Sequence, residues 1–424
     1  MLLTLKIENF RSVKSPLLID FTTEKRLNED NLLYNSFNQN GNELLKSLVF
    51  YGRNASGKSN ILMALDAISY LIENSDTFKH GKNIPPYEPF LFDIESKNNT
   101  VKFEIDFISV KNKIRYKYSM SFNSSEIINE ALYFYPEKVK AKLYERNKEK
   151  ITYGDYYRGT KKKIEDDLLP NQLFLSKSAT SKIKYLDDVY LYFTRYIYVS
   201  ILHDIEYDKS IIRAFSELIL KDENLKQNLL ELLQAADTNI LDFSITENEK
   251  KMKFSDNVPE EAQKEFLDNY KYEVLTIHSL FKNDKEIGKS TLELEKESLG
   301  TKKLFAIGSI IIDTLDDGGV IVIDELDKGL HPLLTKVIIN LFNSKKNNPN
   351  NAQLIFATHD STLLDTKILR RDQICFVDKD YQGGTTIYKL SDIKGIRKDI
   401  PIDKWYLSGR FKAIPVISEV QLKF

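Results

Sequence analysis

The chain has 424 residues, of which 42% are hydrophobic and 29% charged, and its formal net charge is −1 at pH 7. This composition is that of an ordinary soluble globular protein, and the near-zero charge excludes an overall basic field that would attract nucleic acid, although local basic patches remain possible. The single cysteine, Cys375, excludes an internal disulfide and a cysteine metal cluster. We find no signal peptide, and the longest apolar region, 304–315, is too short to span a bilayer. A cytoplasmic protein without membrane contact is expected.

The first expected elements are two strands that pair as a hairpin. Leu3, Leu5 and Ile7 alternate with polar residues, which is the pattern of a half-buried strand. A second apolar stretch, 17–21, follows Ser15 and Pro16 and can pair with the first.

A complete phosphate-binding loop, with the sequence GRNASGKS, occupies residues 52–59. It follows an apolar run, 48–51, typical of a buried strand, and precedes a run, 61–65, typical of a helix start, which is the context that the motif needs. Backbone N–H groups of such a loop surround phosphates, the lysine bridges the β- and γ-phosphates, and the serine hydroxyl ligates Mg²⁺. The residues expected to bind ATP here are Gly52, Asn54, Ala55, Ser56, Gly57, Lys58, Ser59 and Asn60.

Alternation returns in the stretches 101–107, 114–118 and 132–134 and continues at 143–144, which predicts an antiparallel meander. Apolar residues then recur at helical spacing from about 186 to 236, which predicts two to four helices without a long coiled coil. From about residue 285 the pattern is α/β again. The elements expected there are a helix at 302–315 and strands at 320–323, 354–358, 374–377 and 386–389.

The phosphate loop and the later strands therefore lie at opposite ends of the sequence. The expected fold is α/β, with one split nucleotide-binding domain, an antiparallel meander and an inserted helical subdomain. We expect the first half of the nucleotide-binding domain at 1–150, a mainly helical insertion at 151–285 and the second half at 286–424.

The run Gly319-Val-Ile-Val-Ile-Asp324-Glu325 is an apolar strand that ends in two acids. Asp324 is placed to hold Mg²⁺ through water, as in other ATPases. Because a chain bends at the end of a strand, Glu325 can turn toward the γ-phosphate and accept a proton from the attacking water.

Two histidines follow the acids. His359 ends the strand 354–358, and there it can hydrogen-bond the γ-phosphate or the catalytic water. His331 precedes Pro332 and is expected to begin a helix, so we interpret it as structural or interfacial.

The segment Glu297-Ser298-Leu299-Gly300-Thr301 precedes the helix expected from residue 302. A serine, a glycine and a helix N-terminus form an anion site, which suits a nucleotide held by another copy of the chain. The alternative is an ordinary helix cap made by Ser298 or Thr301.

These motifs occur in the order used by ABC-type ATPases. Two further segments, IENFRS at 7–12 and DELDKGLHP at 324–332, narrow this resemblance. With them, the sequence resembles the SMC-like and OLD-like AAA-type ATPases of prokaryotic defence, and most of all the AbiL/RloA type. The segments PFLFD at 89–93 and YLSGRFKAIP at 406–415 also resemble the corresponding segments of that group.

The resemblance implies an ABC-type ATPase head that forms a head-to-tail dimer with two ATP molecules between the subunits. Each nucleotide would meet Ser298 and Gly300 of the second copy, and hydrolysis would open the dimer. It also implies a polar Mg²⁺ ligand, for which Gln172 is the candidate, and a nucleotide contact from Arg11.

Two departures from related proteins narrow the function. The segment around Ser298 lacks the double glycine and glutamine of ABC transporters, which argues against a transporter motor. The 65 residues after His359 leave no room for the metal-dependent Toprim nuclease domain of OLD proteins, and we interpret Asp378-Lys379-Asp380 as a turn.

The leading hypothesis is an ATP-hydrolysing regulatory subunit of an abortive-infection system, which acts as an ATP-driven clamp and controls a separate effector such as a nuclease or toxin. The alternative is an SMC/RecF-like repair or recombination ATPase that binds DNA directly. A third hypothesis is a scaffold that binds ATP and turns it over very slowly.

Overall fold

The computed structural model of the chain describes residues 1–27, 30–200, 209–236, 238–247, 258–396 and 400–414. Residues 201–208 of the expected helical stretch lie outside the described residues. So does Pro415, the last residue of the C-terminal segment 406–415. The chain divides into two compact units, of which unit 1 contains Met1–Ile201, Leu315–Leu326 and Lys336–Phe424 and unit 2 contains Leu202–Thr314 and Asp327–Thr335.

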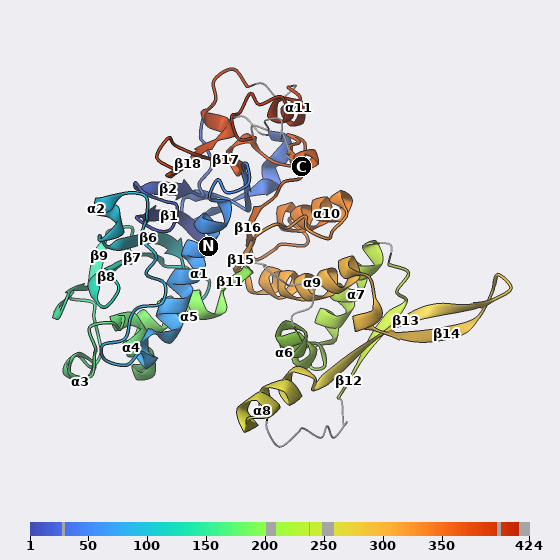
Figure 1. The fold of residues 1–424 in the computed structure, drawn as a ribbon, viewed down its shortest axis with the longest axis horizontal. Coiled ribbons are helices and arrows are strands. Elements are labelled where there is room, and N and C mark those ends of the chain that lie inside the picture. Colours follow the sequence, from blue (N-terminus) through green and yellow to red (C-terminus); the bar gives the residue numbers. More distant parts are fainter. Residues whose placement is uncertain (28–29, 201–208, 237, 248–257, 397–399, 415–424) are drawn as a thin grey trace, which may run out of the picture. The chain divides into compact units, whose positions relative to one another are not determined.

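An antiparallel seven-stranded sheet forms one layer of unit 1 (Figure 1). The first strand of the chain pairs on one side with its hairpin partner and on the other with the meander, as alternation predicted. In sheet order the strands are β10 (Lys150–Tyr153), β9 (Ala141–Asn147), β8 (Ile127–Tyr135), β7 (Arg115–Phe122), β6 (Val101–Ile108), β1 (Leu2–Glu8) and β2 (Leu17–Asp20).

A six-stranded sheet forms the second layer of unit 1. Five of its strands run parallel and the edge strand is antiparallel. In sheet order they are β11 (Ile197–Ser200), β15 (Val320–Ile323), β16 (Gln353–Ala357), β5 (Ser47–Tyr51), β17 (Ile374–Lys379) and β18 (Thr385–Lys389). A small hairpin, β3 (Ser36–Gln39) with β4 (Asn42–Leu45), stands beside them.

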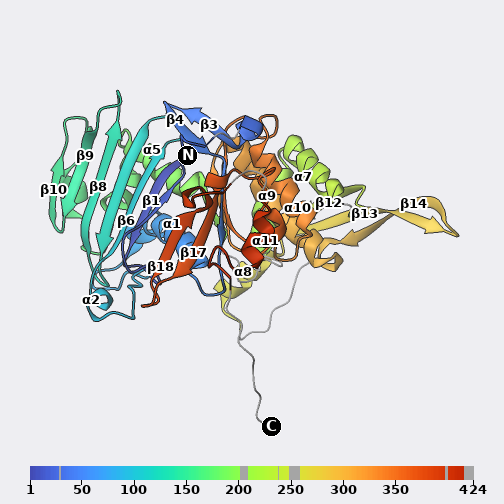
Figure 2. The same cartoon turned by 90° about the horizontal axis from the view of Figure 1, so that it is seen from above.

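Helix α1 (Lys58–Asn74) lies between the two sheets (Figure 2). Its apolar residues are buried around most of its circumference, because they pack into one core with side chains of both sheets. A helix that is apolar nearly all round is the expected solution between two covered layers. The other helices that lie wholly in unit 1 are α2 (Ile94–Lys97), α3 (Lys162–Asp166), α4 (Phe174–Ser178), α5 (Leu186–Arg195) and α11 (Ile402–Leu407).

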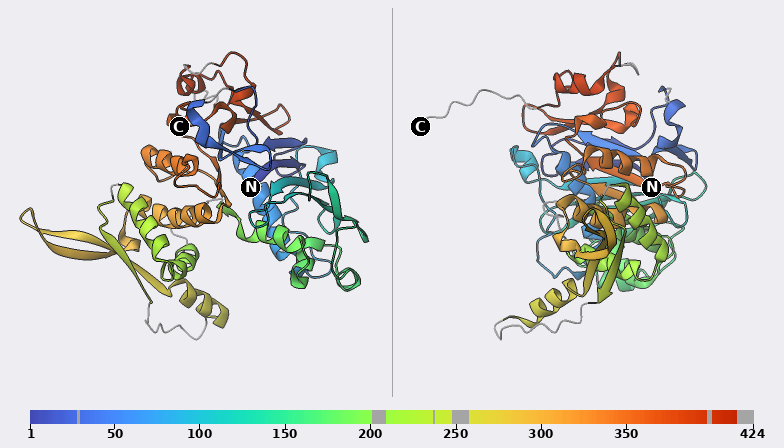
Figure 3. Two further views of the ribbon diagram at one scale, coloured as in Figure 1. Left: turned by 180° about the vertical axis from the view of Figure 1, so that it is seen from behind. Right: turned by 90° about the vertical axis from the view of Figure 1, so that its right-hand side faces the viewer.

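Unit 2 contains helices and a three-stranded antiparallel sheet, so it is less helical than the sequence predicted. Figure 3 shows the β13–β14 hairpin extending from the rest of this unit as a ribbon, and Leu280, Phe281 and Ile287 are exposed near its tip. Its elements are α6 (Lys209–Ile219), α7 (Glu223–Ala235), β12 (Asp242–Glu247), α8 (Glu260–Asn269), β13 (Tyr272–Lys282) and β14 (Lys285–Glu293). Helices α9 (Leu299–Asp317) and α10 (Pro332–Asn343) connect the two units along the chain.

The expected fold class is confirmed, with a mixed sheet that carries the phosphate loop, an antiparallel meander and an insertion that contains helices. The domain limits differ from those expected. Residues 151–200 belong to unit 1, because β11 pairs in parallel with β15 and α5 packs on α1. No helix in the described part of the chain is long and apolar enough to cross a membrane.

The only cysteine provides a probe of this core. Cys375 lies on β17 with 1% of its surface exposed, and burial raises the pKa of its thiol to about 12. Because the thiolate is the reactive form, we expect labelling by a thiol reagent at pH 8 to be roughly 10³-fold slower in the native protein than in urea. Comparison of the two labelling rates tests this, and fast labelling of the native protein would contradict the burial of β17.

Candidate functional site

The phosphate loop connects the C-terminal end of β5 to the first turn of α1. Gly57 takes a φ of 110° and caps the helix, and Ala55 also has a positive φ, 61°. The residues predicted to bind ATP lie as the strand–loop–helix pattern indicated. Gly52, Asn54, Ala55, Ser56 and Gly57 form the loop, and Lys58, Ser59 and Asn60 form the first helical turn.

The side chain of Lys58 curls back over the loop. Its ammonium donates to the carbonyl oxygens of Gly52 at 2.9 Å and Arg53 at 3.3 Å, and the residue is 6% exposed. A loop with a lysine folded across it is the geometry that holds phosphate oxygens. Gly52 cannot be replaced without rearrangement, because a Cβ there would lie 2.3 Å from the carbonyl oxygen of Val377.

The two acids leave β15 at a bend. Asp324 is 6% exposed, and its backbone N–H donates to the carbonyl of Ser200 on β11 at 3.1 Å. Glu325 takes a φ of 48°, which is uncommon for a residue with a side chain and often marks a functional site. Its backbone N–H donates to Oδ1 of Asp324 at 3.1 Å. The chain therefore turns sharply at Glu325, as expected for a strand end.

The loop and the acids lie at the same edge of the sheet. Strand β16 pairs in parallel with β15 on one side and with β5 on the other, so the C-terminal ends of all three strands are aligned. With strands about 4.8 Å apart, the ends of β5 and β15 are separated by roughly 10 Å. Ligands of open parallel sheets bind at this carboxyl edge. The structure thus brings Lys58 and Asp324 to one edge although 266 residues separate them in sequence.

His359 follows β16, the strand between the loop and the acids. Its side chain is exposed, while the adjacent Thr358 is buried and donates its N–H to the carbonyl of Phe50 on β5 at 3.2 Å. The hydroxyl of Tyr51 donates to the carbonyl of Asp360 at 3.0 Å. Two hydrogen bonds therefore hold the turn that carries His359 against β5, the strand that leads into the phosphate loop.

His331 begins α10, as predicted. The N–H of Leu333 donates to its Nδ1 at 3.2 Å, the N–H of Leu334 donates to its carbonyl at 2.8 Å, and Pro332 occupies the first helical position. This is a helix-start role, which agrees with the structural interpretation.

Ser298 and Gly300 lie in unit 2, at the start of α9. Ser298 caps the helix, since its Oγ accepts from the N–H of Thr301 at 3.1 Å. A Cβ on Gly300 would lie 2.9 Å from the carbonyl oxygen of Gly329, so the helix start packs closely on the loop after the acids. Within one copy of the chain, Ser298 therefore acts as an ordinary helix cap, which is the alternative considered for this segment.

The residue before this cap is held by strand β13. Oε1 of Glu297 lies 2.6 Å from Oγ1 of Thr276 and 2.7 Å from Nε2 of His278. Nδ1 of His278 lies 3.1 Å from the carbonyl of Asn239. The start of α9 is thus anchored to the strand that continues into the exposed hairpin.

Arg11 lies beside the first turns of α1 but is engaged by protein groups. Its Nε pairs with Oε2 of Glu88 at 2.7 Å, and Nη1 contacts the sulfur of Met63. The residue has a φ of 52° and donates its N–H to the carbonyl of Glu88 at 2.6 Å. The structure brings Arg11 to the helix of the phosphate loop, where Glu88 holds its guanidinium.

Gln172 does not lie at the metal position, and this prediction is wrong. Its Nε2 donates to the carbonyls of Asp76 and Phe78 at 2.8 and 3.0 Å, just beyond the C-terminal end of α1. Ser59 is at the other end of this 17-residue helix, which is about 25 Å long. The side chain therefore ties a loop to the far end of α1.

The sequence interpretation missed one ion pair of the phosphate loop. Nε of Arg53 lies 3.2 Å from Oδ1 of Asp378, at the end of β17. Asp380 has the turn role that was expected, since its Oδ1 accepts from the N–H groups of Gln382 and Gly384 at 2.8 Å each. Asp378 has a second role, which no local pattern could reveal because Arg53 is more than 300 residues away.

The donor set fits a magnesium ion that is bound together with a nucleotide. Among the described residues no group of three or more His, Cys, Asp or Glu side chains could hold a metal ion. Mg²⁺ is typically held by one or two protein oxygens together with substrate phosphates and water. Ser59 and Asp324 provide such oxygens at the carboxyl edge of the sheet. The loop also suits a phosphate group. The hydroxyl oxygen of Ser56 is buried and has no hydrogen-bond partner among the described residues, so a bound phosphate could supply one.

Comparison with known proteins supports the nucleotide-binding interpretation. Residues 47–365 match the family model described as "AAA domain, putative AbiEii toxin, Type IV TA system". The matched region is more than half of the chain. The chain belongs to this AAA domain family. The AAA domain begins at β5, immediately before the phosphate loop, and ends shortly after His359, so it includes both acids and helix α9, which Ser298 caps.

Three SMC head structures are among the solved structures that resemble the AAA domain protein along most of its length. The SmcHead bound to the C-winged helix domain of ScpA has 13% identity and a TM-score of 0.46, covering 92% of this chain and 97% of that chain. The SMC head domain from Thermotoga maritima has 13% identity and a TM-score of 0.40, with 92% and 98% covered. The Smc head with an extended coiled coil bound to the C-terminal domain of ScpA, derived from Pyrococcus furiosus, has 14% identity and a TM-score of 0.40, with 92% and 96% covered. No curated protein matches the chain.

Proposed function

We propose that this protein is an ATPase that binds ATP with Mg²⁺ and hydrolyses it to ADP and phosphate. The observation that carries the proposal is the position of β16 between β5 and β15, which aligns the phosphate loop, the two acids and His359 at one sheet edge. Membership of the AAA domain family supports it.

Each side chain has a distinct role in the proposed reaction. The loop N–H groups and Lys58 hold the phosphates, while Ser59 and Asp324 hold Mg²⁺, which neutralises charge on the transferred phosphoryl group. Glu325 orients the attacking water and accepts its proton, and His359 hydrogen-bonds the γ-phosphate or that water. Water attacks the γ-phosphorus, the bond to the β-phosphate oxygen breaks, and ADP leaves with that oxygen.

The proposed working form is a head-to-tail homodimer in the cytoplasm, with ATP bound between the copies. Ser298 and Gly300 of one copy would complete the site of the other. The helix start at Leu299 supports this, because the positive end of the helix dipole suits a phosphate. The anchoring of Glu297 to Thr276 and His278 holds this helix start in a defined position.

The biological role that we propose is control of a separate effector, a nuclease or toxin, in an abortive-infection type of anti-phage system. The family description, which refers to a toxin–antitoxin system, and the resemblance of the sequence to defence ATPases support it. The test is to purify the chain alone and incubate it with DNA and RNA. Strong cleavage by the purified chain that is abolished by mutating a site away from the ATPase residues would overturn the regulatory role.

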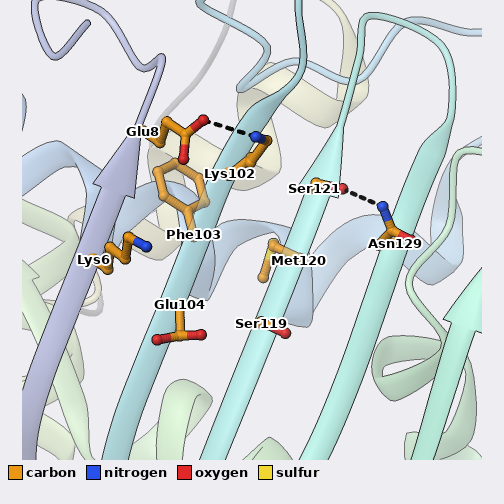
Figure 4. A pocket seen from close by; sticks show the side chains of 9 residues that line it. All are labelled: Lys6, Glu8, Lys102, Phe103, Glu104, Ser119, Met120, Ser121 and Asn129. Carbon is orange, nitrogen blue, oxygen red and sulfur yellow. Dashed lines mark hydrogen bonds and ion pairs between the residues drawn. The ribbon is translucent and has the colours of Figure 1, made fainter. Parts of the chain in front are cut away.

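Direct DNA binding, as in a repair or recombination ATPase, is not favoured by the outer face of the seven-stranded sheet. Figure 4 shows a hollow of about 260 Å³ on this face, where Lys102 pairs with Glu8 at 2.7 Å and Asn129 bonds Ser121 at 3.1 Å. Further pairs on the strands of this sheet are Lys117–Glu104, Arg115–Asp106 and Lys142–Glu145, and Lys148 pairs with Glu126 in the turns next to it. Basic groups that are paired in this way form no platform for a phosphate backbone. Binding to duplex DNA that falls steeply with salt would favour the alternative.

The proposed ATPase has a direct test at the phosphate loop. We expect Lys58→Ala to weaken ATP binding at least roughly 100-fold, because the loop loses the cation that faces the phosphates. Calorimetric titration with ATP and Mg²⁺ measures this. The matched control is Lys102→Ala, which removes a lysine from the outer sheet face and should leave affinity unchanged. Equal ATP affinity in the two variants would contradict the proposal.

A scaffold that binds ATP without appreciable turnover is the remaining alternative. The left-handed backbone at Glu325, a conformation that often marks a functional site, favours real turnover. Phosphate release by the purified protein distinguishes the two.

A further inference from the structure

Four polar groups from three distant parts of unit 1 form a chain of hydrogen bonds behind the phosphate loop. Nδ2 of Asn60 lies 2.7 Å from Oγ of Ser12, which lies 2.7 Å from Oγ1 of Thr385. Oγ1 of Thr385 in turn donates to the carbonyl oxygen of Ser56 at 3.0 Å. Ser12, Thr385 and Ser56 are each less than a tenth exposed, so water does not substitute for these bonds.

These hydrogen bonds can run in only one donor-to-acceptor direction, from Asn60 to the carbonyl oxygen of Ser56. A carbonyl oxygen can only accept, so the Thr385 hydroxyl must give its single proton to Ser56. Thr385 Oγ1 then accepts the proton of the Ser12 hydroxyl, and Ser12 Oγ accepts from the amide of Asn60. Every hydroxyl proton is used, and the chain ends on the phosphate loop.

The last bond fixes the orientation of one loop peptide. In a planar trans peptide the C=O and the following N–H point in opposite directions. Because Thr385 holds the carbonyl of Ser56 on the outer side of the loop, the N–H of Gly57 points to the inner side, where phosphate oxygens bind.

The same residues press directly on the loop glycine. A Cβ on Gly57 would lie 2.1 Å from Thr385 Oγ1 and 2.8 Å from Ser12 Oγ. The backbone of Ser12 joins the contact, since its carbonyl accepts from the N–H of Thr385 at 2.7 Å. The loop is thus supported from behind by the N-terminal segment and by β18.

We propose that Ser12 and Thr385 are positioning residues for phosphate binding, which act through the Ser56–Gly57 peptide. This rests on the proposed ATPase function and deepens it, because it assigns control of the phosphate cradle to residues outside the loop. Without the Thr385 hydroxyl the buried carbonyl of Ser56 loses its partner, and the peptide is free to rotate away from the conformation that presents the Gly57 N–H.

The decisive variant is Thr385→Val, which removes the hydroxyl and keeps the side-chain shape. We expect the Kd for ATP and for inorganic tripolyphosphate to rise by a similar factor, roughly tenfold, since a buried carbonyl loses its hydrogen bond. The thermal midpoint of the ligand-free protein should fall by only a few degrees relative to the control, because one buried hydrogen bond contributes about 1–3 kcal/mol to stability. Thr385→Ser, which restores the donor, should recover most of the affinity.

Thr386→Val is the matched control. Thr386 is the next residue of β18, is exposed, and donates to the carbonyl of Asp378 at 3.3 Å. Ser12→Ala should raise the Kd less than Thr385→Val, and the double variant Ser12→Ala/Thr385→Val should be no weaker than Thr385→Val alone, because the chain is already broken.

The outcomes separate this proposal from the proposed function. If Thr385→Val binds ATP as well as Thr386→Val does, or if tripolyphosphate affinity is unchanged, the positioning role is wrong while the ATPase stands. If neither the wild-type protein nor any variant binds ATP, the proposed function itself fails. Should Thr385→Val not fold, Ser12→Ala decides, and an unchanged Kd for tripolyphosphate in that variant overturns the role.

Discussion

Replacing Glu325 with glutamine is expected to lower the rate of ATP hydrolysis by about 10²–10⁴-fold, the range for loss of a general base. Glutamine keeps the shape of the side chain but cannot accept a proton from water. The bend at Glu325 and the bond from its N–H to Asp324 do not depend on the carboxylate, so the backbone of the site should persist. ATP affinity should therefore remain close to that of the wild type, and phosphate release together with calorimetric titration measures both quantities.

The same variant tests the proposed clamp. With hydrolysis blocked, ATP should hold two copies together, so Glu325→Gln should elute as a dimer in ATP and as a smaller species without nucleotide. Glu104→Gln makes the same chemical change on the outer sheet face, where Glu104 pairs with Lys117 at 2.8 Å, and should hydrolyse ATP normally. Unchanged hydrolysis in Glu325→Gln would show that another group is the base.

Removing the guanidinium of Arg146 is expected to destabilise unit 1 by about 3–5 kcal/mol, the cost of breaking a buried charge network. Glu130 is fully buried and accepts from Tyr118, Tyr144 and two backbone N–H groups at 2.7–3.0 Å, with Arg146 3.8 Å away. Arg146 also donates to carbonyls of the segment 169–172, and burial lowers its pKa. Arg146→Met leaves Glu130 without its cation and those carbonyls without their donor.

Urea unfolding followed by fluorescence measures this change in the free energy of unfolding. The control is Lys117→Met on the same sheet, because Lys117 pairs with Glu104 at 2.8 Å and about a third of each side chain is exposed. Such a partly exposed pair contributes at most about 1 kcal/mol. Similar losses in both variants would mean that the network around Glu130 has no special role in stability.

Sequence periodicity and motifs were sufficient to predict the positions of the strands that carry the candidate site. The strands at 320–323, 353–357 and 47–51 begin and end within a residue or so of the expected positions, because each is an apolar run closed by a polar or glycine-containing turn. The order of motifs along the chain also fixed which strand carries which acid or histidine. These are local signals, and local signals survive in a single sequence.

The failures concern contacts between distant parts of the chain. Gln172 has a plausible position in sequence, but nothing in it reveals that the side chain reaches residues 76–78 instead of Ser59. The strands β12–β14 were missed because an exposed strand such as β14, with nine residues, lacks clear alternation of apolar and polar residues. Thr385 lay just outside the expected strand 386–389, and no local pattern could reveal its hydrogen bond to Ser12, which joins residues 373 positions apart.

The parallel sheet of unit 1 has a consequence for synthesis on the ribosome. Strand β5 lies between β16 and β17, both made about 300 residues later. At about 5–20 residues per second, a nascent β5 waits for tens of seconds before its neighbours exist, with five buried-type residues and two open edges. Until then it is a site for misassociation, so newly made chains should depend on chaperones, and nucleotide retention should appear only once β17 and β18 have emerged.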